Sequence, residues 1–266
     1  MDGPVVVLLH GFPEFWYGWR KQIEPLAAAG FRVVVPDQRG YNLSGKPADI
    51  ASYALPELVS DVIAIVNQLG QEKIFLAGHD WGGAVAWSAA LLHPQRIARL
   101  AVLNCPHPSV MRKFLSTRIR QFLRSWYMLF FQFPRLPEAF LSSFNYQFAV
   151  RALLRSSRAG TFSSEDIARY RAAWSQPGAL TGMIHWYRAL FRQRTKFADR
   201  TVRVPTRILW GERDRFLLSE MAHESLRYCT DGELHTFANA SHWLQHEEAA
   251  SVSRHLIDFF RAGGTA

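Results

Sequence analysis

An aspartate stands at the centre of the most informative motif in this chain. Residues 78–83 are Gly-His-Asp-Trp-Gly-Gly, between an apolar run at 74–77 and a helix-forming run at 84–91. This pattern is typical of a nucleophile elbow, in which small residues allow a sharp turn and present the central side chain at the end of a strand. A carboxylate is ionised at neutral pH without a base, so Asp80 predicts attack on an alkylating carbon and an ester intermediate.

Two polar residues follow later apolar runs in the order that such a nucleophile requires. Asp214 comes after the run at 207–210, and His242 comes after the run at 233–237. This order of nucleophile, acid and histidine is typical of α/β-hydrolases. We expect Asp214 to orient His242, with Glu212 as the alternative acid. His242, neutral and with a pKa near the usual value of about 6.5, would then deprotonate the water that cleaves the ester.

A turn near the start of the chain is a candidate oxyanion hole. Residues 10–13 are His-Gly-Phe-Pro and follow the first apolar run, 5–9. In a fold with a nucleophile elbow, we expect the backbone N–H groups of Phe12 and Trp81 to face the ester oxygen when water attacks. Pro13 fixes this turn and is a candidate for a cis peptide bond.

The elements that must position these residues alternate between two patterns. Short β-branched or apolar runs are punctuated by Gly, Pro or Asp, and amphipathic helical patterns lie between them, for example at 55–69 and 251–260. This alternation predicts an α/β fold, with a mostly parallel sheet flanked by helices. The predicted strands are 5–9, 32–35, 74–77, 99–103, 207–210 and 233–237.

The alternation stops in the middle of the chain. Between about Pro106 and Asp199 there are only helical patterns, rich in Arg, Phe, Trp and Tyr. We therefore predict an all-helical lid at 106–199, above the carboxyl ends of the strands where ligands bind. The core would then comprise residues 1–105 and 200–266.

Composition excludes several classes of function. The chain has 266 residues, 48% of them hydrophobic, but no apolar run approaches the roughly 20 residues that a membrane span needs. With no recognisable signal peptide, we expect a cytoplasmic protein without stable membrane insertion. Cys105 and Cys229 lie far apart and show no metal-ligand spacing, so we expect free thiols, no metal and no cofactor.

The net charge of +9 raises the question of nucleic-acid binding. The basic residues crowd the middle of the chain, but they alternate with large apolar residues at helical spacing, and no recognition motif accompanies them. We interpret them as the solvated faces of amphipathic helices and expect no nucleic-acid partner.

The chain resembles the epoxide hydrolases of the α/β-hydrolase superfamily over nearly its whole length. The motifs that carry the resemblance are His-Gly-Phe-Pro-Glu at 10–14 with its sequel at 16–20, Gly-Tyr-Asn-Leu-Ser at 40–44, and the elbow at 78–83. Asn42 stands where the family more usually has glycine. Asn104 occupies the place that some dehalogenases give to the acid, and its neutral amide leaves that role to Asp214.

The resemblance implies two further catalytic residues. Tyr127 and Tyr187, one from each side of the lid, match the tyrosines that hold the epoxide oxygen in this family. A phenol can hydrogen-bond the alkoxide formed by ring opening and transfer a proton to it. Family members usually carry about two strands before the strand that leads to the His-Gly motif. The chain starts directly before Val5, so we expect those strands to be missing, leaving an open sheet edge that favours a homo-oligomer.

The sequence therefore predicts conversion of a small apolar epoxide, aryl or alkyl, and water to a vicinal diol. A haloalkane dehalogenase, with the Trp81 indole at the halide, and a non-catalytic binder of small ligands remain the alternatives. The expected walls of the substrate pocket are aromatic or aliphatic: Trp81, Trp126, Phe130, Phe131, Trp186 and Leu190.

Overall fold

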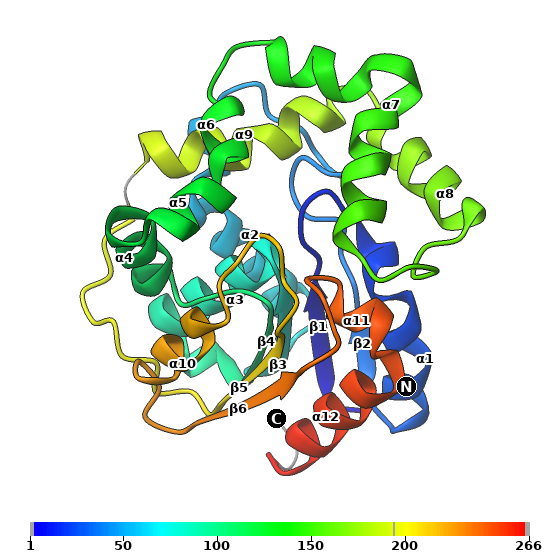
Figure 1. The fold of residues 1–266 in the computed structure, drawn as a ribbon. Helices are drawn as coiled ribbons and strands as arrows, with labels where there is room; N and C mark the ends of the chain where they lie inside the picture. The colour runs from blue at the N-terminus through cyan, green and yellow to red at the C-terminus, as the bar shows by residue number, and fades with distance from the viewer. Residues whose placement is uncertain (1–2, 194, 264–266) are drawn as a thin grey trace.

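The computed structural model describes residues 3–193 and 195–263 and is built around a six-stranded sheet (Figure 1). All neighbouring strands are parallel, in the order β2-β1-β3-β4-β5-β6. The predicted α/β class and all six predicted strands are confirmed, with ends that differ by at most two residues. The strands are β1 (Val5–Leu9), β2 (Arg32–Val34), β3 (Ile74–His79), β4 (Ile97–Leu103), β5 (Thr206–Gly211) and β6 (Gly232–Phe237).

Helices cover both faces of the sheet, as a parallel sheet with buried strands requires. Alternate residues of β1 point to opposite faces, so Val6 and Leu8 join the core under α1 (Arg20–Ala28) and α12 (Ala249–Arg261). The other residues of β1 join the core under α2 (Leu55–Gln68) and α3 (Trp81–Leu92). The remaining core helices are α10 (Glu220–Leu226) and α11 (Leu244–Glu247). Within the described residues no strand precedes β1, and β2 is the sheet edge beside it.

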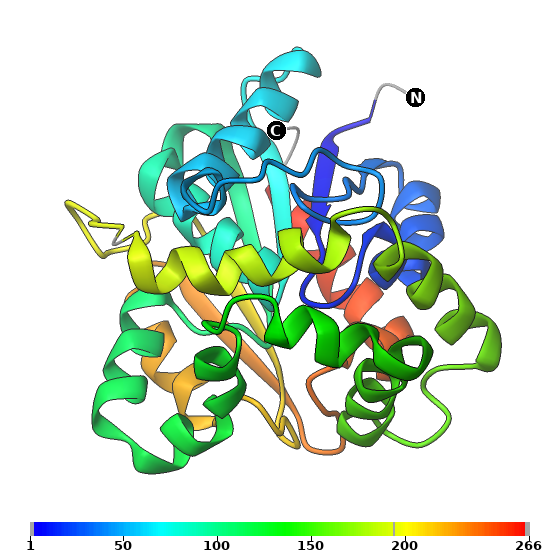
Figure 2. The same cartoon turned by 90° about the horizontal axis from the view of Figure 1, so that it is seen from above.

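The helices between β4 and β5 form a separate layer, which we call the lid. Seen from above, α9 crosses the carboxyl ends of the strands, with α6 and α7 beside it (Figure 2). The backbone of α7 is kinked, because residues 143–146 have non-helical backbone angles. The lid helices are α4 (Pro108–Thr117), α5 (Ile119–Arg124), α6 (Trp126–Phe130), α7 (Leu136–Ser156), α8 (Ser164–Trp174) and α9 (Ala179–Arg192). The exact boundaries at 105/106 and 199/200 stay a prediction.

Two sequence expectations concern features outside the site. Cys105 and Cys229 are free thiols. In the part of the chain that the structure describes, no helix has the length and apolar character needed to cross a membrane.

Candidate active site

Asp80 occupies a strained turn between β3 and α3. Its backbone has φ 50° and ψ −121°, which a residue with a side chain adopts at a cost. The turn is also very tight: a Cβ on Gly78 would collide with the carbonyl oxygen of Gly82, and one on Gly82 would collide with that of Leu9. The small residues of the motif are therefore needed for close packing, and the predicted elbow is present.

Asp80, His242 and Asp214 come together although they are far apart in the sequence. The Nε2 of His242 lies 3.4 Å from Oδ2 of Asp80, and its Nδ1 donates to Oδ2 of Asp214 at 2.7 Å. The other oxygen of Asp214 accepts from the backbone N–H groups of Phe216 at 2.7 Å and Leu217 at 3.0 Å. These bonds fix the carboxylate against the imidazole.

The alternative acid, Glu212, is exposed, whereas Asp214 is buried. Asn104, which follows β4, supports Asp214 directly: its amide nitrogen donates to Oδ2 of Asp214 at 2.8 Å. The amide oxygen of Asn104 accepts from the backbone N–H of Gly211 at 3.0 Å. Sequence reasoning assigned Asn104 no role, although its place directly after a strand was a usable signal.

A buried carboxylate holds the loop that carries His242. Glu14 accepts hydrogen bonds from Tyr170 and His246, each at 2.7 Å, and contacts Nδ1 of His79 at 3.2 Å. The other ring nitrogen of His79 donates to the backbone carbonyl of His242 at 2.8 Å. Burial raises the pKa of Glu14, but the two histidines outweigh this effect and hold that pKa well below its usual range. An ionised Glu14 therefore connects α8 of the lid with the catalytic loop.

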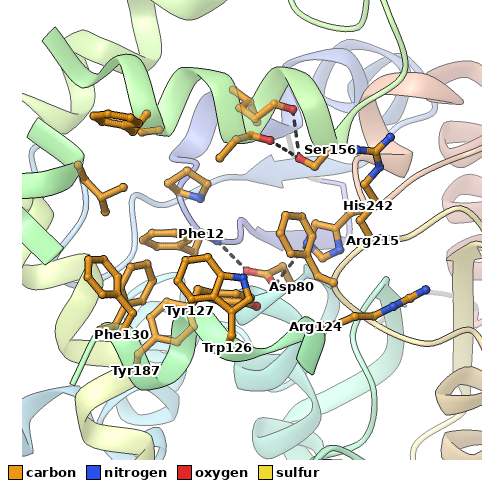
Figure 3. Close-up of a pocket in the computed structure, with 18 of the residues that line it drawn as sticks. Phe12, Asp80, Arg124, Trp126, Tyr127, Phe130, Ser156, Tyr187, Arg215 and His242 are labelled. Atoms are coloured by element: carbon orange, nitrogen blue, oxygen red, sulfur yellow. Dashed lines mark hydrogen bonds and ion pairs between the residues drawn. The ribbon is translucent and has the colours of Figure 1, made fainter. Parts of the chain in front are cut away.

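The turn at Phe12 lies against Asp80, and the role of its N–H group in an oxyanion hole stays a prediction. Its backbone N–H donates to Oδ1 of Asp80 at 2.8 Å, and the bond between Phe12 and Pro13 is cis (Figure 3). Trp81 is the first residue of α3, and amides in the first turn of a helix have no acceptor within the helix. The contribution of the Trp81 amide stays a prediction.

The two carboxylates beside His242 change its charge. Burial lowers the pKa of His242, but Asp214 and Asp80 together outweigh burial and raise that pKa to about 10. Burial raises the pKa of Asp80, yet His242 and the Phe12 amide hold it below its usual range. Our expectation of a neutral His242 is therefore wrong for the unreacted site, because an imidazolium between two carboxylates is the stable state.

A cavity of about 390 Å³ opens in front of Asp80 and His242 (Figure 3). Its lining is largely aromatic and aliphatic, with Tyr127 from α6 and Tyr187 from α9 among it. The two phenol rings are 5.9 Å apart and meet edge to face. Burial and the nearby charge of Asp80 raise the pKa of both phenols, so both carry their proton at neutral pH.

The predicted pocket walls divide into two groups. Trp126, Phe130 and Phe131 line the cavity, whereas Trp186 and Leu190 do not, so their prediction as walls is wrong. Because successive residues of a helix point about 100° apart, a Tyr187 that faces the cavity directs Trp186 away from it.

The indole of Trp186 instead donates to the carbonyl of Arg39 at 2.9 Å. The ring of Trp81 also lies outside the lining, and it packs edge to face against Tyr187 with ring centroids 5.0 Å apart.

Sequence reasoning missed one complete wall of the cavity. The second half of α7 contributes five residues at helical spacing: Phe148, Ala149, Ala152, Leu153 and Ser156. Their spacing marks one face of a helix and was a usable signal. Phe216 and the side chains of Arg124 and Arg215 complete another wall.

Comparison with known proteins places this site in a family. Residues 4–249 match the family of the alpha/beta hydrolase fold. The AB hydrolase superfamily protein YfhM of Bacillus subtilis is 46% identical over 260 residues, covering 98% of this chain and 91% of that protein. Epoxide hydrolase 4 of Mus musculus is 41% identical over 265 residues, covering 97% of this chain and 73% of that protein.

Solved structures agree with the sequence relatives. The crystal structure of the Bacillus megaterium epoxide hydrolase in complex with an inhibitor matches with a TM-score of 0.89 and 29% identity, over 98% of this chain and 94% of that one. The resemblance inferred from the motifs is confirmed. The chain belongs to the epoxide hydrolases of the α/β-hydrolase superfamily.

Proposed function

We propose that this protein hydrolyses a small apolar epoxide to a vicinal diol through an ester on Asp80. One observation carries the proposal: a carboxylate paired with His242 faces an apolar cavity in which two protonated phenols, Tyr127 and Tyr187, also lie. Relatives named epoxide hydrolases support the same chemistry. A cavity of this size and lining suits an aryl or alkyl epoxide better than a charged substrate.

In the first step, an oxygen of Asp80 attacks one carbon of the epoxide ring. The ring C–O bond breaks, and its electron pair stays on the oxygen. A phenol of Tyr127 or Tyr187 hydrogen-bonds this oxygen and transfers a proton to it. The packed aromatic walls exclude water, which strengthens this hydrogen bond.

In the second step, water attacks the carbonyl carbon of the ester. Ester formation removes the negative charge of Asp80, one of the two charges that raise the pKa of His242, so that pKa must fall. His242 then gives up its proton, which returns through solvent to the tyrosinate left by the first step, and the neutral imidazole becomes the base for water while Asp214 holds its ring in place. When the tetrahedral intermediate collapses, the imidazolium protonates the departing diol oxygen, and the proton of the new Asp80 carboxyl group returns to His242. The N–H groups of Phe12 and Trp81 stabilise the oxyanion.

The alternatives are less consistent with the geometry. A haloalkane dehalogenase of the predicted type needs the Trp81 indole at the halide, but that ring is not part of the cavity lining. A non-catalytic binder gives no reason for the strained backbone of Asp80 or for its pairing with His242. A cytoplasmic location and a homo-oligomeric state stay predictions.

The test is a single turnover in heavy-oxygen water, with enzyme in excess over styrene oxide. Because the first diol takes its new oxygen from the Asp80 carboxylate, it should be unlabelled, and later turnovers should release labelled diol. Asp80→Ala should show no turnover. Label in the first diol would mean direct attack by water and would refute the ester. Turnover of bromoalkanes but not of epoxides would instead favour the dehalogenase.

A further inference from the structure

The mouth of the cavity is formed by exposed apolar side chains of the lid. Leu123, Trp126 and Phe140 line the cavity and are also exposed to solvent, Trp126 by 62%. Side chains that belong both to the lining and to the surface mark the opening. The cavity therefore opens between α5, α6 and the first half of α7.

The apolar surface continues beyond this opening. Ring contacts connect Phe140 to Phe148 at 4.3 Å and Phe148 to Phe144 at 6.1 Å. Phe144 is 81% exposed. We call the whole surface the mouth patch, and its members are Ile119, Phe122, Leu123, Trp126, Leu129, Phe140 and Phe144.

The exposed large hydrophobic side chains are concentrated in the lid. Among the described residues, Trp16 and Leu43 are the large hydrophobic side chains exposed outside it, against eleven within it. A concentration of exposed apolar side chains of this kind marks a site of association, because water solvates apolar surface poorly.

Positive charge gathers on the same layer. Residues 106–199 hold 15 of the 31 Lys and Arg residues but only 4 of the 22 Asp and Glu residues, so 16 basic and 18 acidic residues remain elsewhere. Arg118 and Arg120 flank Ile119 and are exposed. Neither forms an ion pair with an acidic residue in the part of the chain that the structure describes. The net positive charge of the chain therefore belongs to the lid.

We propose that the mouth patch docks on the surface of an anionic phospholipid bilayer. Apolar side chains flanked by arginines match such a surface, because the rings enter the acyl boundary while the guanidinium groups meet headgroup phosphates. A second copy of the chain fits less well, since two positive lids would face each other. A protein partner needs a complementary shape, whereas fluid lipid accepts protruding side chains on short helices.

Docking in this way turns the cavity mouth towards the bilayer interior, in which apolar molecules dissolve. The proposal rests on the exposed side chains and the charge, and it does not depend on which reaction Asp80 performs.

Co-sedimentation with vesicles tests the proposal. The whole protein should bind vesicles that contain phosphatidylglycerol and bind pure phosphatidylcholine vesicles much less. Replacing Ile119 and Phe122 by serine removes two apolar contacts outside the cavity and should weaken binding at least tenfold. Arg118→Gln with Arg120→Gln should weaken it about fivefold per arginine, and added salt should do the same.

Matched controls locate the docking face. Leu43→Ser removes an apolar side chain that lies outside the lid; Leu43 is 75% exposed, close to the 69% of Ile119. Arg254→Gln with Arg261→Gln removes two exposed arginines of α12, at the end of the molecule away from the lid (Figure 1). Both controls should keep at least half of the binding. Phe144→Ser serves as a second patch variant should the Ile119 and Phe122 variant fail to fold.

Three outcomes would overturn the proposal. The first is no preference for phosphatidylglycerol. The second is an equal loss of binding in the α12 and α5 variants, which would mean that overall charge alone attracts the protein. The third is a patch variant that dissociates a dimer in light scattering but binds vesicles normally, which would make the mouth patch an interface between copies.

Discussion

The core and the lid hold their functional side chains by different physical means. In the core, Asp214 is fixed by hydrogen bonds from two backbone amides and from Asn104, in addition to His242. In the lid, Tyr187 is held by ring contacts, with Phe131 at 4.9 Å and Phe12 at 5.2 Å. The difference follows from charge, because a buried carboxylate needs directional donors whereas a neutral phenol can be packed by its apolar ring.

This contrast suggests a division of roles. In the core, Asp80 and His242 are ionised before substrate arrives, and their positions are set by the strand ends. The lid tyrosines are neutral, and contacts of their rings supply the packing that holds them. Variants of the two regions should therefore fail at different steps.

The largest effect is expected in the core. His242→Gln removes the base for water but leaves the Asp80 carboxylate in place, so ester hydrolysis should fall on the order of 10⁴-fold or more. Alkylation should continue, and mass spectrometry should find the peptide with Asp80 heavier by one intact substrate. The double variant with Asp80→Ala should show no such adduct. If His242→Gln formed no adduct with any reactive epoxide, the assignment of His242 to ester hydrolysis alone would be contradicted.

Variants of the two lid tyrosines should slow the first step, the alkylation of Asp80. Each of Tyr127→Phe and Tyr187→Phe removes a donor worth roughly 2–4 kcal/mol to the developing alkoxide, which is about 30- to 1,000-fold in alkylation rate. The double variant should lose nearly all alkylation, measured by stopped flow, with ester hydrolysis little changed. Tyr146→Phe is the matched control, because this lid tyrosine is not part of the cavity lining and donates to the Trp174 carbonyl. Normal epoxide turnover in the double variant would refute the assignment of the two tyrosines as donors to the alkoxide.

A smaller loss is expected when only the support of the acid is removed. Asn104→Gly keeps the positive φ of 42° available but deletes the hydrogen bond to Asp214. A hydrogen bond to a charged group contributes about 1.5–3 kcal/mol, so ester hydrolysis should slow roughly 10- to 100-fold and its pH profile should shift. The control is Asn42→Gly, at a φ of 41° outside the cavity lining. An unchanged pH profile in Asn104→Gly would contradict a role through Asp214.

The last expected effect is on stability and its dependence on pH, not on a reaction rate. The pKa of His242 is about 10 in the folded protein and about 6.5 in the unfolded chain. Its contribution to the free energy of unfolding is therefore complete below pH 6.5 and is lost as the pH rises through 10, at no more than about 1.4 kcal/mol per pH unit. Urea unfolding at pH 6.5, 8 and 9.5 should show this decline in the natural protein and a weaker one in His242→Gln. If the free energy of unfolding fell equally with pH in both proteins, His242 would be neutral in the unreacted site.

Local patterns in the sequence determined the framework of this protein. The four central strands, β1, β3, β4 and β5, could be predicted because they are short runs whose buried faces demand apolar residues. The edge strands β2 and β6 are less buried, and their prediction rested on their place in the alternation of strands and helices. The elbow at Asp80 could be predicted because its small residues are adjacent in sequence to the residue that they expose. Asp214 and His242 could be predicted because their chain order follows the order of strands in the fold.

The tertiary structure decided the rest. Trp186 was misplaced because the rotation of α9 about its axis depends on what packs against each face. The charge of His242 was misjudged because Asp80 and Asp214 lie far from it in sequence and raise its pKa only after folding brings them together. The α7 wall was missed for a related reason. Helical spacing shows which residues share a face, but only tertiary packing shows whether that face meets the core, the cavity or the solvent.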